Sequence, residues 1–189
     1  MKSFDLKGTS RTEVGKKSTS ELRKNNGIPC VLYGIEKEAQ AFAVTTDAVR
    51  KLVYTPDIHL VNLTIDGKEC TAILKDIQFH PVKDTILHMD FLQVVADKPI
   101  VMEVPTVLNG LAAGVKLGGK LQQAIRKIKV KALYANIPEK LTVDVTELGL
   151  GKSIKVGDLS FENLELVTPA QTVVCSVAAT RASREAASK

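Results

Sequence analysis

Short stretches in which apolar and polar residues alternate restrict the fold of this chain more than any other feature. From Val61 to Ile65 every second residue is apolar, and Asp66-Gly67 follows directly. Successive side chains of a β-strand point to opposite faces, so this period of two predicts a strand with one buried face. An Asp-Gly pair after such a strand is typical of a tight hairpin turn. We therefore expect a hairpin whose return strand covers residues 69–79.

Similar apolar segments along the chain indicate a mainly β protein. In the first half they predict strands over residues 2–8, 29–34, 40–45, 61–65, 69–79 and 86–95. In the second half they predict strands over residues 99–108, 126–134, 139–145 and 172–178. The composition agrees, because 44% of the residues are hydrophobic and only 4% are aromatic, as expected for cores of Val, Leu and Ile.

Two short helices are expected between the strands of the first half. The first covers residues 17–26, where Ser18 and Glu21 match a capping box and Gly27 suits the position after the helix. The second is expected to begin at Thr46, whose hydroxyl can cap a helix N-terminus.

A change of composition near residues 96–99 predicts a domain boundary, because no histidine follows it and aromatic residues become rare. We expect one mainly β domain over residues 1–95 and a second over residues 96–180. The last residues, 181–189, are polar and are expected to form a loose tail.

Several classes of function have little support in the sequence. The three cysteines and three histidines lack the short, regular spacing of metal ligands, and the cysteines are expected to be buried small hydrophobes. We therefore expect no metal, no cofactor, no catalysis and no small-molecule substrate. No apolar run approaches 18 residues and no signal peptide is visible, so we expect a cytoplasmic protein without a membrane segment.

A glycine-rich stretch leaves a nucleotide-binding enzyme open as an unfavoured alternative. Residues Gly114 to Lys120 match the phosphate-loop pattern G-x-x-x-x-G-K, but Leu121 follows where magnesium binding requires Ser or Thr. Gly-Lys-Ser at 151–153 supplies the hydroxyl but has Thr146 where the first glycine belongs. We favour turns and a connection between sheets here.

Basic residues are concentrated in two places. Lys127, Lys129 and Lys131 alternate with apolar residues, which favours a solvated strand face over RNA contact. Residues 1–24 hold seven Lys or Arg against three acids, close to the net charge of +5 of the whole chain. There, basic side chains flank a helix start, where backbone N–H groups attract phosphate. This segment favours an anionic partner, although a solvated helix is the alternative.

The order of several motifs resembles a known family. The motifs are Arg11-x-x-x-Gly15-Lys16, Leu22-Arg23-x-x-x-Gly27-Ile28-Pro29, Val31-Leu32-Tyr33-Gly34, Asp76-x-Gln78-x-His80-Pro81 and His88-x-Asp90-Phe91. Together they resemble the bacterial large-subunit ribosomal protein numbered twenty-five, which binds 5S ribosomal RNA. The resemblance continues to about residue 178 and matches the long two-domain form, often called general stress protein Ctc.

The resemblance implies an N-terminal β-barrel with a few short helices and a separate C-terminal β domain. It also implies a structural component of the large ribosomal subunit, with 5S rRNA and neighbouring ribosomal proteins as partners. The barrel would bind the loop E region of 5S rRNA on its minor-groove side. The implied RNA-binding residues, with Lys17 added from the basic segment, are Arg11, Lys16, Lys17, Thr19, Arg23, Tyr33, Gln78, His88 and Asp90.

Strand periodicity supports part of this surface, because it places Gln78 on the face of Asp76, and His88 on the face of Asp90. The chain departs from the family at Ser20 and Glu21, where the family usually has two arginines. We expect the loss of two cations to change the affinity and the individual contacts rather than the kind of partner. A general RNA-binding stress protein without a ribosomal role stays open as an alternative.

Overall fold

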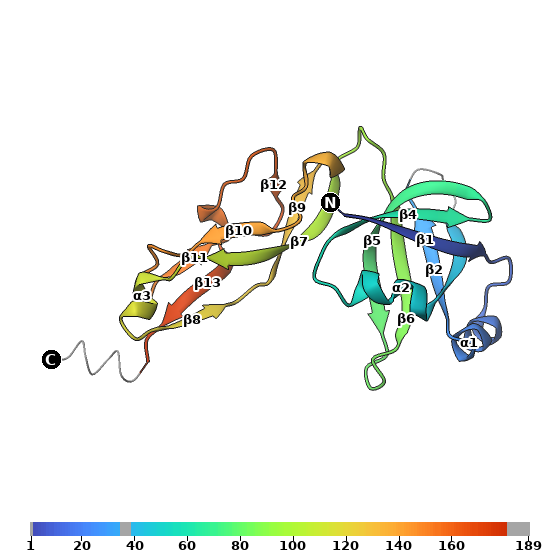
Figure 1. Cartoon of the computed structure of the whole chain (residues 1–189), viewed down its shortest axis with the longest axis horizontal. Helices are drawn as coiled ribbons and strands as arrows, with labels where there is room; N and C mark the ends of the chain where they lie inside the picture. Colours follow the sequence, from blue (N-terminus) through green and yellow to red (C-terminus); the bar gives the residue numbers. More distant parts are fainter. Residues whose placement is uncertain (1, 35–38, 181–189) are drawn as a thin grey trace. The chain divides into compact units, whose positions relative to one another are not determined.

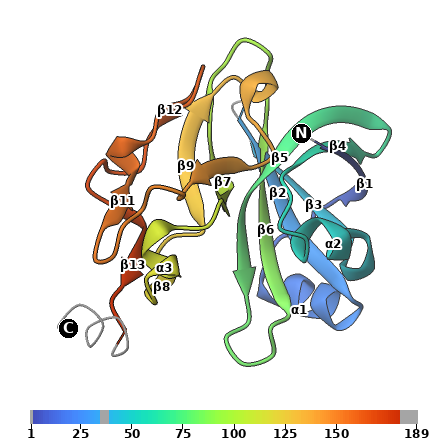
Figure 2. The same cartoon turned by 60° about the vertical axis from the view of Figure 1, so that its left-hand side comes forward.

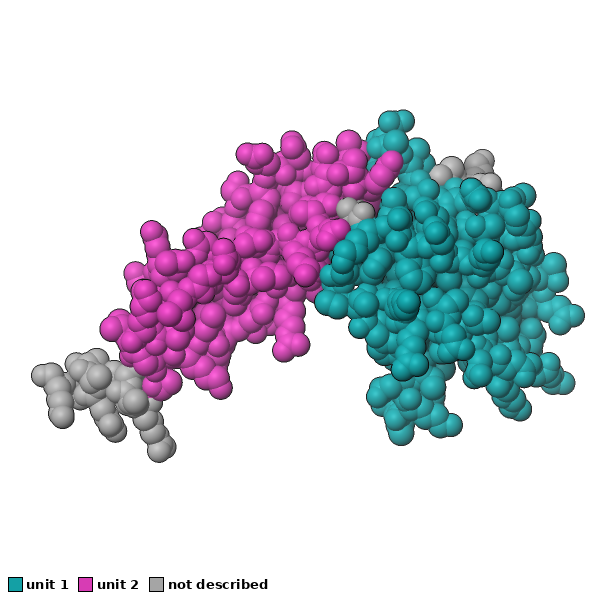
Figure 3. All heavy atoms as spheres, viewed as in Figure 1, with its two compact units in different colours: residues 1–98 teal, residues 99–189 magenta. Residues whose placement is uncertain are grey.

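The computed structural model describes residues 2–34 and 39–180 and divides the chain into two compact units, residues 1–98 and 99–189 (Figure 3). Each unit is mainly β-structure, which confirms the expected fold class. The tail expected at residues 181–189 lies outside the described residues. Within the described part, no helix has the length and apolar character that crossing a membrane requires.

The N-terminal unit is a closed β-barrel (Figures 1 and 2). Its strands follow one another in the order β1-β3-β2-β6-β5-β4, and β4 pairs with β1 to close it. The β1–β4 and β2–β6 pairs are parallel, and the others are antiparallel. Closure pairs each of these strands on both sides. They are β1 (Lys2–Ser10), β2 (Gly27–Tyr33), β3 (Gln40–Thr45), β4 (His59–Ile65), β5 (Lys68–Phe79) and β6 (Ile86–Gln93).

The hairpin between β4 and β5 confirms the prediction from alternation. Ile65 pairs with Lys68, so Asp66-Gly67 forms the two-residue turn. The φ angles of these residues are 48° and 85°. Positive φ at both positions is the requirement of a type I′ turn, which Asp-Gly meets at little cost.

The barrel interior is filled by alternate residues from every strand. The largest fully buried side chains include Leu6, Ile28, Phe42, Met89 and Phe91. The rings of Phe42 and Phe91 pack in a tilted arrangement with their centroids 5.6 Å apart. Full burial of one such side chain contributes about 1.5–3 kcal/mol, so the inward set is strongly specified. The residues between these inward positions must therefore point outward.

Helix α1 (Lys16–Lys24) begins one residue earlier than predicted and ends two residues earlier. The predicted capping box is wrong, because Gly15 is the N-cap and Ser18 lies inside the first turn. The Ser18 hydroxyl donates to the Glu13 carbonyl at 3.3 Å. After the helix, Asn26 has a φ of 57°, so Asn26 rather than Gly27 takes the left-handed position, and Gly27 begins β2.

Helix α2 (Thr46–Val53) buries Val49 and Leu52 in the barrel core. Thr46 begins this helix as predicted, but it is the first helical residue and not the cap, which is Thr45. The Thr46 hydroxyl instead donates to the Asn26 carbonyl at 2.9 Å. It thereby joins the start of α2 to the chain after α1.

The C-terminal unit contains a four-stranded sheet in the order β10-β7-β9-β12 and a three-stranded sheet in the order β11-β13-β8. The predicted strands are present, but three very short ones were missed because two to four residues carry too little alternation. The missed strands are β8 (Lys120–Gln123), β11 (Ser153–Lys155) and β12 (Glu165–Leu166). The other elements are β7 (Ile100–Asn109), α3 (Ala113–Lys116), η1 (Tyr134–Asn136), β9 (Lys127–Ala132), β10 (Leu141–Asp144), η2 (Val156–Asp158) and β13 (Val173–Ala178).

The glycine-rich stretch is a packed connection. Every backbone N–H from Ala113 to Gly119 donates to a carbonyl of the same unit. These donors are therefore engaged, whereas a phosphate-binding loop must present them to its ligand. A Cβ at Gly114 would lie 2.7 Å from the backbone nitrogen of Leu150, so the glycine permits close contact between two backbone segments.

Two of the three lysines of β9 have acidic partners on the neighbouring strands. Lys129 lies 3.9 Å from a carboxylate oxygen of Glu103, and Lys131 lies 2.9 Å from one of Glu165. Exposed pairs of this kind contribute only about 0–1 kcal/mol each, but they neutralise the face. This pairing favours the solvated strand face over RNA contact.

We expect Gly114→Ala to destabilise the C-terminal unit by about 1–3 kcal/mol, because the added methyl group must displace backbone atoms. The measurement is urea unfolding followed by amide exchange of the β13 residues. Gly149→Ala is the matched control, since a Cβ there meets only the Lys152 side chain, at 3.9 Å. Equal unfolding midpoints for the two variants would contradict the close-contact role of Gly114.

Candidate nucleic-acid interface

The start of α1 carries cations that helix stability does not explain. Lys16 and Lys17 occupy the first turn, where the helix dipole disfavours positive charge by a few tenths of a kcal/mol or more. The helix buries no residue, and its first turn holds no acid. Within residues 2–34 and 39–180, neither lysine forms an ion pair. Both ammonium groups are therefore available to an external anion.

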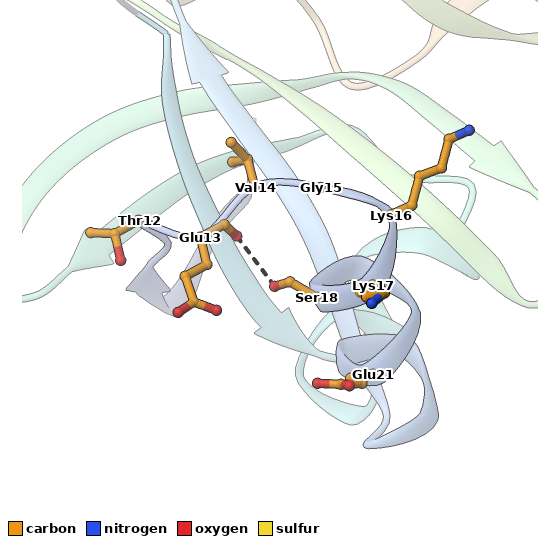
Figure 4. Close-up of a pocket in the computed structure, with 8 residues that line it drawn as sticks. All are labelled: Thr12, Glu13, Val14, Gly15, Lys16, Lys17, Ser18 and Glu21. Carbon is orange, nitrogen blue, oxygen red and sulfur yellow. Dashed lines mark hydrogen bonds between the residues drawn. The ribbon is translucent and has the colours of Figure 1, made fainter.

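A shallow depression in front of α1 mixes both signs of charge (Figure 4). It is lined by Thr12, Glu13, Val14, Gly15, Lys16, Lys17, Ser18 and Glu21. The Lys16 side chain extends away from Glu13 and Glu21, which lie on the other side of the depression (Figure 4). Glu21 thus adds a second carboxylate beside Glu13. The two carboxylates make the depression poorly suited to a small anion. Lys16, which points outward, can instead contact an extended anion outside the depression.

Arg11 connects the chain before α1 to the helix itself. Its guanidinium donates to the Glu13 carbonyl at 3.2 Å and to the Thr19 hydroxyl at 3.4 Å. Its backbone N–H donates to the Ala41 carbonyl at 2.9 Å, which continues the sheet past β1. Two predicted site residues, Arg11 and Thr19, are therefore in contact.

Arg23 fastens the end of α1 to the barrel. Its Nε and Nη2 both donate to the Leu87 carbonyl of β6, at 3.1 and 2.8 Å. Hydrogen bonds from a charged donor contribute about 1.5–3 kcal/mol when they are shielded and less when exposed, as here. This geometry gives Arg23 a positioning role beside His88.

The outer face of β5 and β6 gathers four polar side chains. In this antiparallel pair Gln78 lies opposite His88, and Asp76 lies opposite Asp90, while Met89 between them is fully buried. Irregularities in the register next to Asp76 and after Gln78 determine which residues of β5 pair with which residues of β6. The strand-face argument from sequence is therefore confirmed for these residues.

His88 and Asp90 form a fixed pair on this face. Nδ1 of His88 lies 2.7 Å from Oδ1 of Asp90, and both side chains are half-buried. The carboxylate accepts the Nδ1 proton, and in the neutral tautomer that this bond selects Nε2 is a hydrogen-bond acceptor. Together with the carboxylates, this makes the face rich in acceptors.

Tyr33 lies at the end of β2, which pairs in parallel with β6, and its side chain is 37% exposed. Partial burial raises the pKa of the Tyr33 phenol, and the negative charges of Asp90 and Asp76 raise it further. The phenol is therefore within electrostatic reach of both carboxylates and stays protonated as a donor near neutral pH.

The barrel interior beneath this face is chemically inert. Burial, with a smaller contribution from the charge of Asp90, raises the pKa of the Cys30 thiol to about 12, while Arg11 opposes this shift. Cys175 is also buried, as expected, whereas Cys70 is only half-buried and corrects that expectation. Among the described residues, no group of three metal-ligating side chains is present.

The contacts thus link most of the predicted residues into neighbouring groups. Arg11 meets Thr19 on α1, Arg23 of the same helix reaches β6 beside His88, and His88 lies next to Asp90 and opposite Gln78. Asp76 was left out of the predicted site. Its position two residues before Gln78, on the same strand face, was the available signal.

Comparison with known proteins assigns the two units to ribosomal proteins. The Ribosomal L25p family model matches residues 6–91, and the model for the C-terminal domain of ribosomal protein TL5 matches residues 99–181. The chain is 62% identical to large ribosomal subunit protein bL25 of Phocaeicola vulgatus, over 99% of the chain and 98% of that protein. It is 61% identical to the protein of the same name from Bacteroides thetaiotaomicron, over 99% of the chain and 97% of that protein. The corresponding protein of Porphyromonas gingivalis is 57% identical, over 100% of the chain and 99% of its own length.

The N-terminal barrel and the C-terminal unit together therefore define a two-domain ribosomal protein. The chain belongs to the Ribosomal L25p family. These relatives are named as ribosomal proteins and not as enzymes, which agrees with the engaged backbone of the glycine-rich stretch.

We expect Arg23→Ala to loosen α1 while the barrel stays folded, because both bonds to the Leu87 carbonyl are lost. Amide exchange within residues 18–24 should become several-fold faster, with little change in β4 and β5. Lys24→Ala removes the same charge from the same turn and leaves these bonds intact, so it should change exchange little. Similar exchange rates in the two variants would rule out the fastening role.

Proposed function

We propose that this protein is a structural component of the large ribosomal subunit and binds 5S rRNA through its N-terminal barrel. The bound region would be loop E, approached from its minor-groove side. The observation that supports the proposal is the grouping of Arg11, Arg23, Tyr33, Gln78 and His88 on α1, the chain just before it and the adjoining outer face of the barrel.

The two parts of this surface suit two different parts of RNA. Lys16 and Lys17 at the start of α1 present ammonium groups to phosphates, together with the N–H groups of the helix N-terminus. Phosphate contacts supply affinity and orientation. They release counterions, so they make binding depend on salt.

The outer face of β5 and β6 suits base edges and ribose hydroxyl groups. The minor groove of A-form RNA is wide and shallow, and it displays 2′-hydroxyl groups and base edges. Gln78 can donate and accept, Tyr33 can donate, and His88 presents an acceptor nitrogen. The barrel holds these groups on paired strands, so little conformational entropy is lost when RNA binds.

The C-terminal unit would contact neighbouring ribosomal proteins, because two of the three lysines of β9 are already paired with acids. In the cell the protein would be cytoplasmic and associated with ribosomes. It needs no cofactor for this work, since the proposed mechanism is the rigid docking of a preformed surface onto RNA.

We expect binding to 5S rRNA to weaken as salt rises, with a slope of log K against log salt of about −4 to −5 for five or six phosphate contacts. The double variant Lys16→Ala, Lys17→Ala should reduce the magnitude of this slope by about 2, at roughly 0.9 for each phosphate. Lys51→Ala on α2 is the control and should leave the slope unchanged. A wild-type slope near zero would contradict the electrostatic part of the proposal.

The alternative function, that of a general RNA-binding stress protein, predicts a different result in a competition experiment. A specific 5S rRNA protein should lose little bound 5S rRNA to an equal mass of unrelated structured RNA at moderate salt. A general RNA-binding protein should lose about half of its bound 5S rRNA. Sedimentation of a cell lysate through sucrose provides the second test, because a ribosomal component should migrate with large subunits.

A further inference from the structure

A shallow groove on the C-terminal unit combines apolar side chains with cations. Its apolar lining comes from Ile125, which precedes β9, and from Val167 and Pro169, which follow β12. Val167 is 45% exposed to solvent. Single exposed hydrophobic side chains are common on protein surfaces, but several that line one groove indicate a contact site.

The segment that carries Val167 is fixed to the sheet. The Val167 N–H donates to the Lys129 carbonyl at 2.9 Å, and the Lys129 N–H donates to the Thr168 hydroxyl oxygen at 2.9 Å. Both backbone groups of Lys129 are therefore engaged, and the attachment to β9 continues past the two residues of β12. The groove is thus preformed, so little protein conformational entropy is lost when it is filled.

The polar groups of the groove are mainly hydrogen-bond donors. Lys127 is exposed and forms no ion pair within residues 2–34 and 39–180. Thr168 accepts from Lys129, which leaves its own hydroxyl proton to an external acceptor. Lys129 lies 3.9 Å from a carboxylate oxygen of Glu103, and Glu103 is the only acid among the described residues that line the groove. The positive charges therefore exceed the negative ones, which favours a partner with acidic groups.

The apolar lining favours an acidic protein segment over RNA. Phosphate contacts need cations that are free of other partners, and Lys127 is the one that the groove supplies among the described residues. Glu103 would repel a second phosphate. An aliphatic side chain, by contrast, would remove Val167 and Pro169 from water, and a neighbouring Asp or Glu would accept from Lys127.

We propose that this groove binds an acidic segment of a neighbouring ribosomal protein, with an aliphatic side chain against Val167 and a carboxylate beside Lys127. The inference rests on the proposed function, and it identifies a site on the C-terminal unit and the chemistry of its partner. The apolar contact supplies affinity. The carboxylate fixes the orientation of the segment, because charge complementarity disfavours other arrangements.

The first experiment uses large ribosomal subunits purified with the wild-type protein in place. A carbodiimide reagent joins an amine directly to a carboxylate in contact with it, and mass spectrometry of the digested proteins identifies the two residues. We expect Lys127 to be joined to an Asp or Glu of another ribosomal protein. Subunits in which Lys127 is joined to no other protein, or in which ultraviolet light joins the groove to rRNA, would overturn the inference.

The second experiment compares binding to large subunits depleted of this protein with binding to isolated 5S rRNA. Val167→Asp places a negative charge in the apolar lining, so it should weaken binding to the depleted subunits about tenfold and leave binding to 5S rRNA unchanged. Leu117→Asp is the matched control, because Leu117 is an exposed apolar residue of the same unit outside the groove, and it should change neither affinity. Equal binding of Val167→Asp and wild-type protein to the depleted subunits, or an equal loss in Leu117→Asp, would contradict the site.

A charge reversal tests the role of the carboxylate. Lys127→Glu should weaken binding to the depleted subunits about fivefold at low salt, and changing the cross-linked acid of the partner to Lys should restore it. Unfolding midpoints equal to that of the wild type show that the variants are folded, and the cross-link needs no variant at all. A wild-type protein that binds neither depleted subunits nor 5S rRNA would overturn the proposed function itself. Binding to 5S rRNA without any effect of the groove variants would overturn only this inference.

Discussion

The antiparallel register of β5 and β6 is the constraint on which the proposed surface depends. It places Gln78 opposite His88 and Asp76 opposite Asp90, and it buries Met89 between them. A shift of one residue would turn the polar set toward the core and the apolar set toward water. Burial of the barrel core therefore fixes the position of the polar side chains, and the same interactions that stabilise the fold organise the site.

The charge of the N-terminal unit is divided between two kinds of surface. Lys16 and Lys17 are unpaired cations at a helix start, within the described residues, whereas β5 and β6 present two carboxylates and the imidazole of His88. Arg23 joins the two, because it belongs to the helix and bonds the backbone of β6. Net charge alone conceals this division, because the two surfaces carry side chains of opposite sign.

Sequence patterns predicted the parts of the molecule that depend on periodicity and turn chemistry. The Asp66-Gly67 hairpin, the mainly β fold and the outward set of β5 and β6 follow from alternation, and the structure agrees with them. The capping box at Ser18 failed, because the helix begins at Lys16 and Gly15 replaces a side-chain cap. Closure of the barrel and the bonds of Arg23 depend on contacts between distant segments, which local patterns do not encode.

Barrel topology also determines when the surface can exist during protein synthesis. Strand β2 pairs in parallel with β6, which ends at Gln93, although α1 and β2 are made within the first 33 residues. Segments so far apart in sequence pair only after the intervening chain is available. A nascent chain therefore displays its cations well before it can present the residues of β6. The complete polar face can therefore assemble only when the whole barrel has emerged.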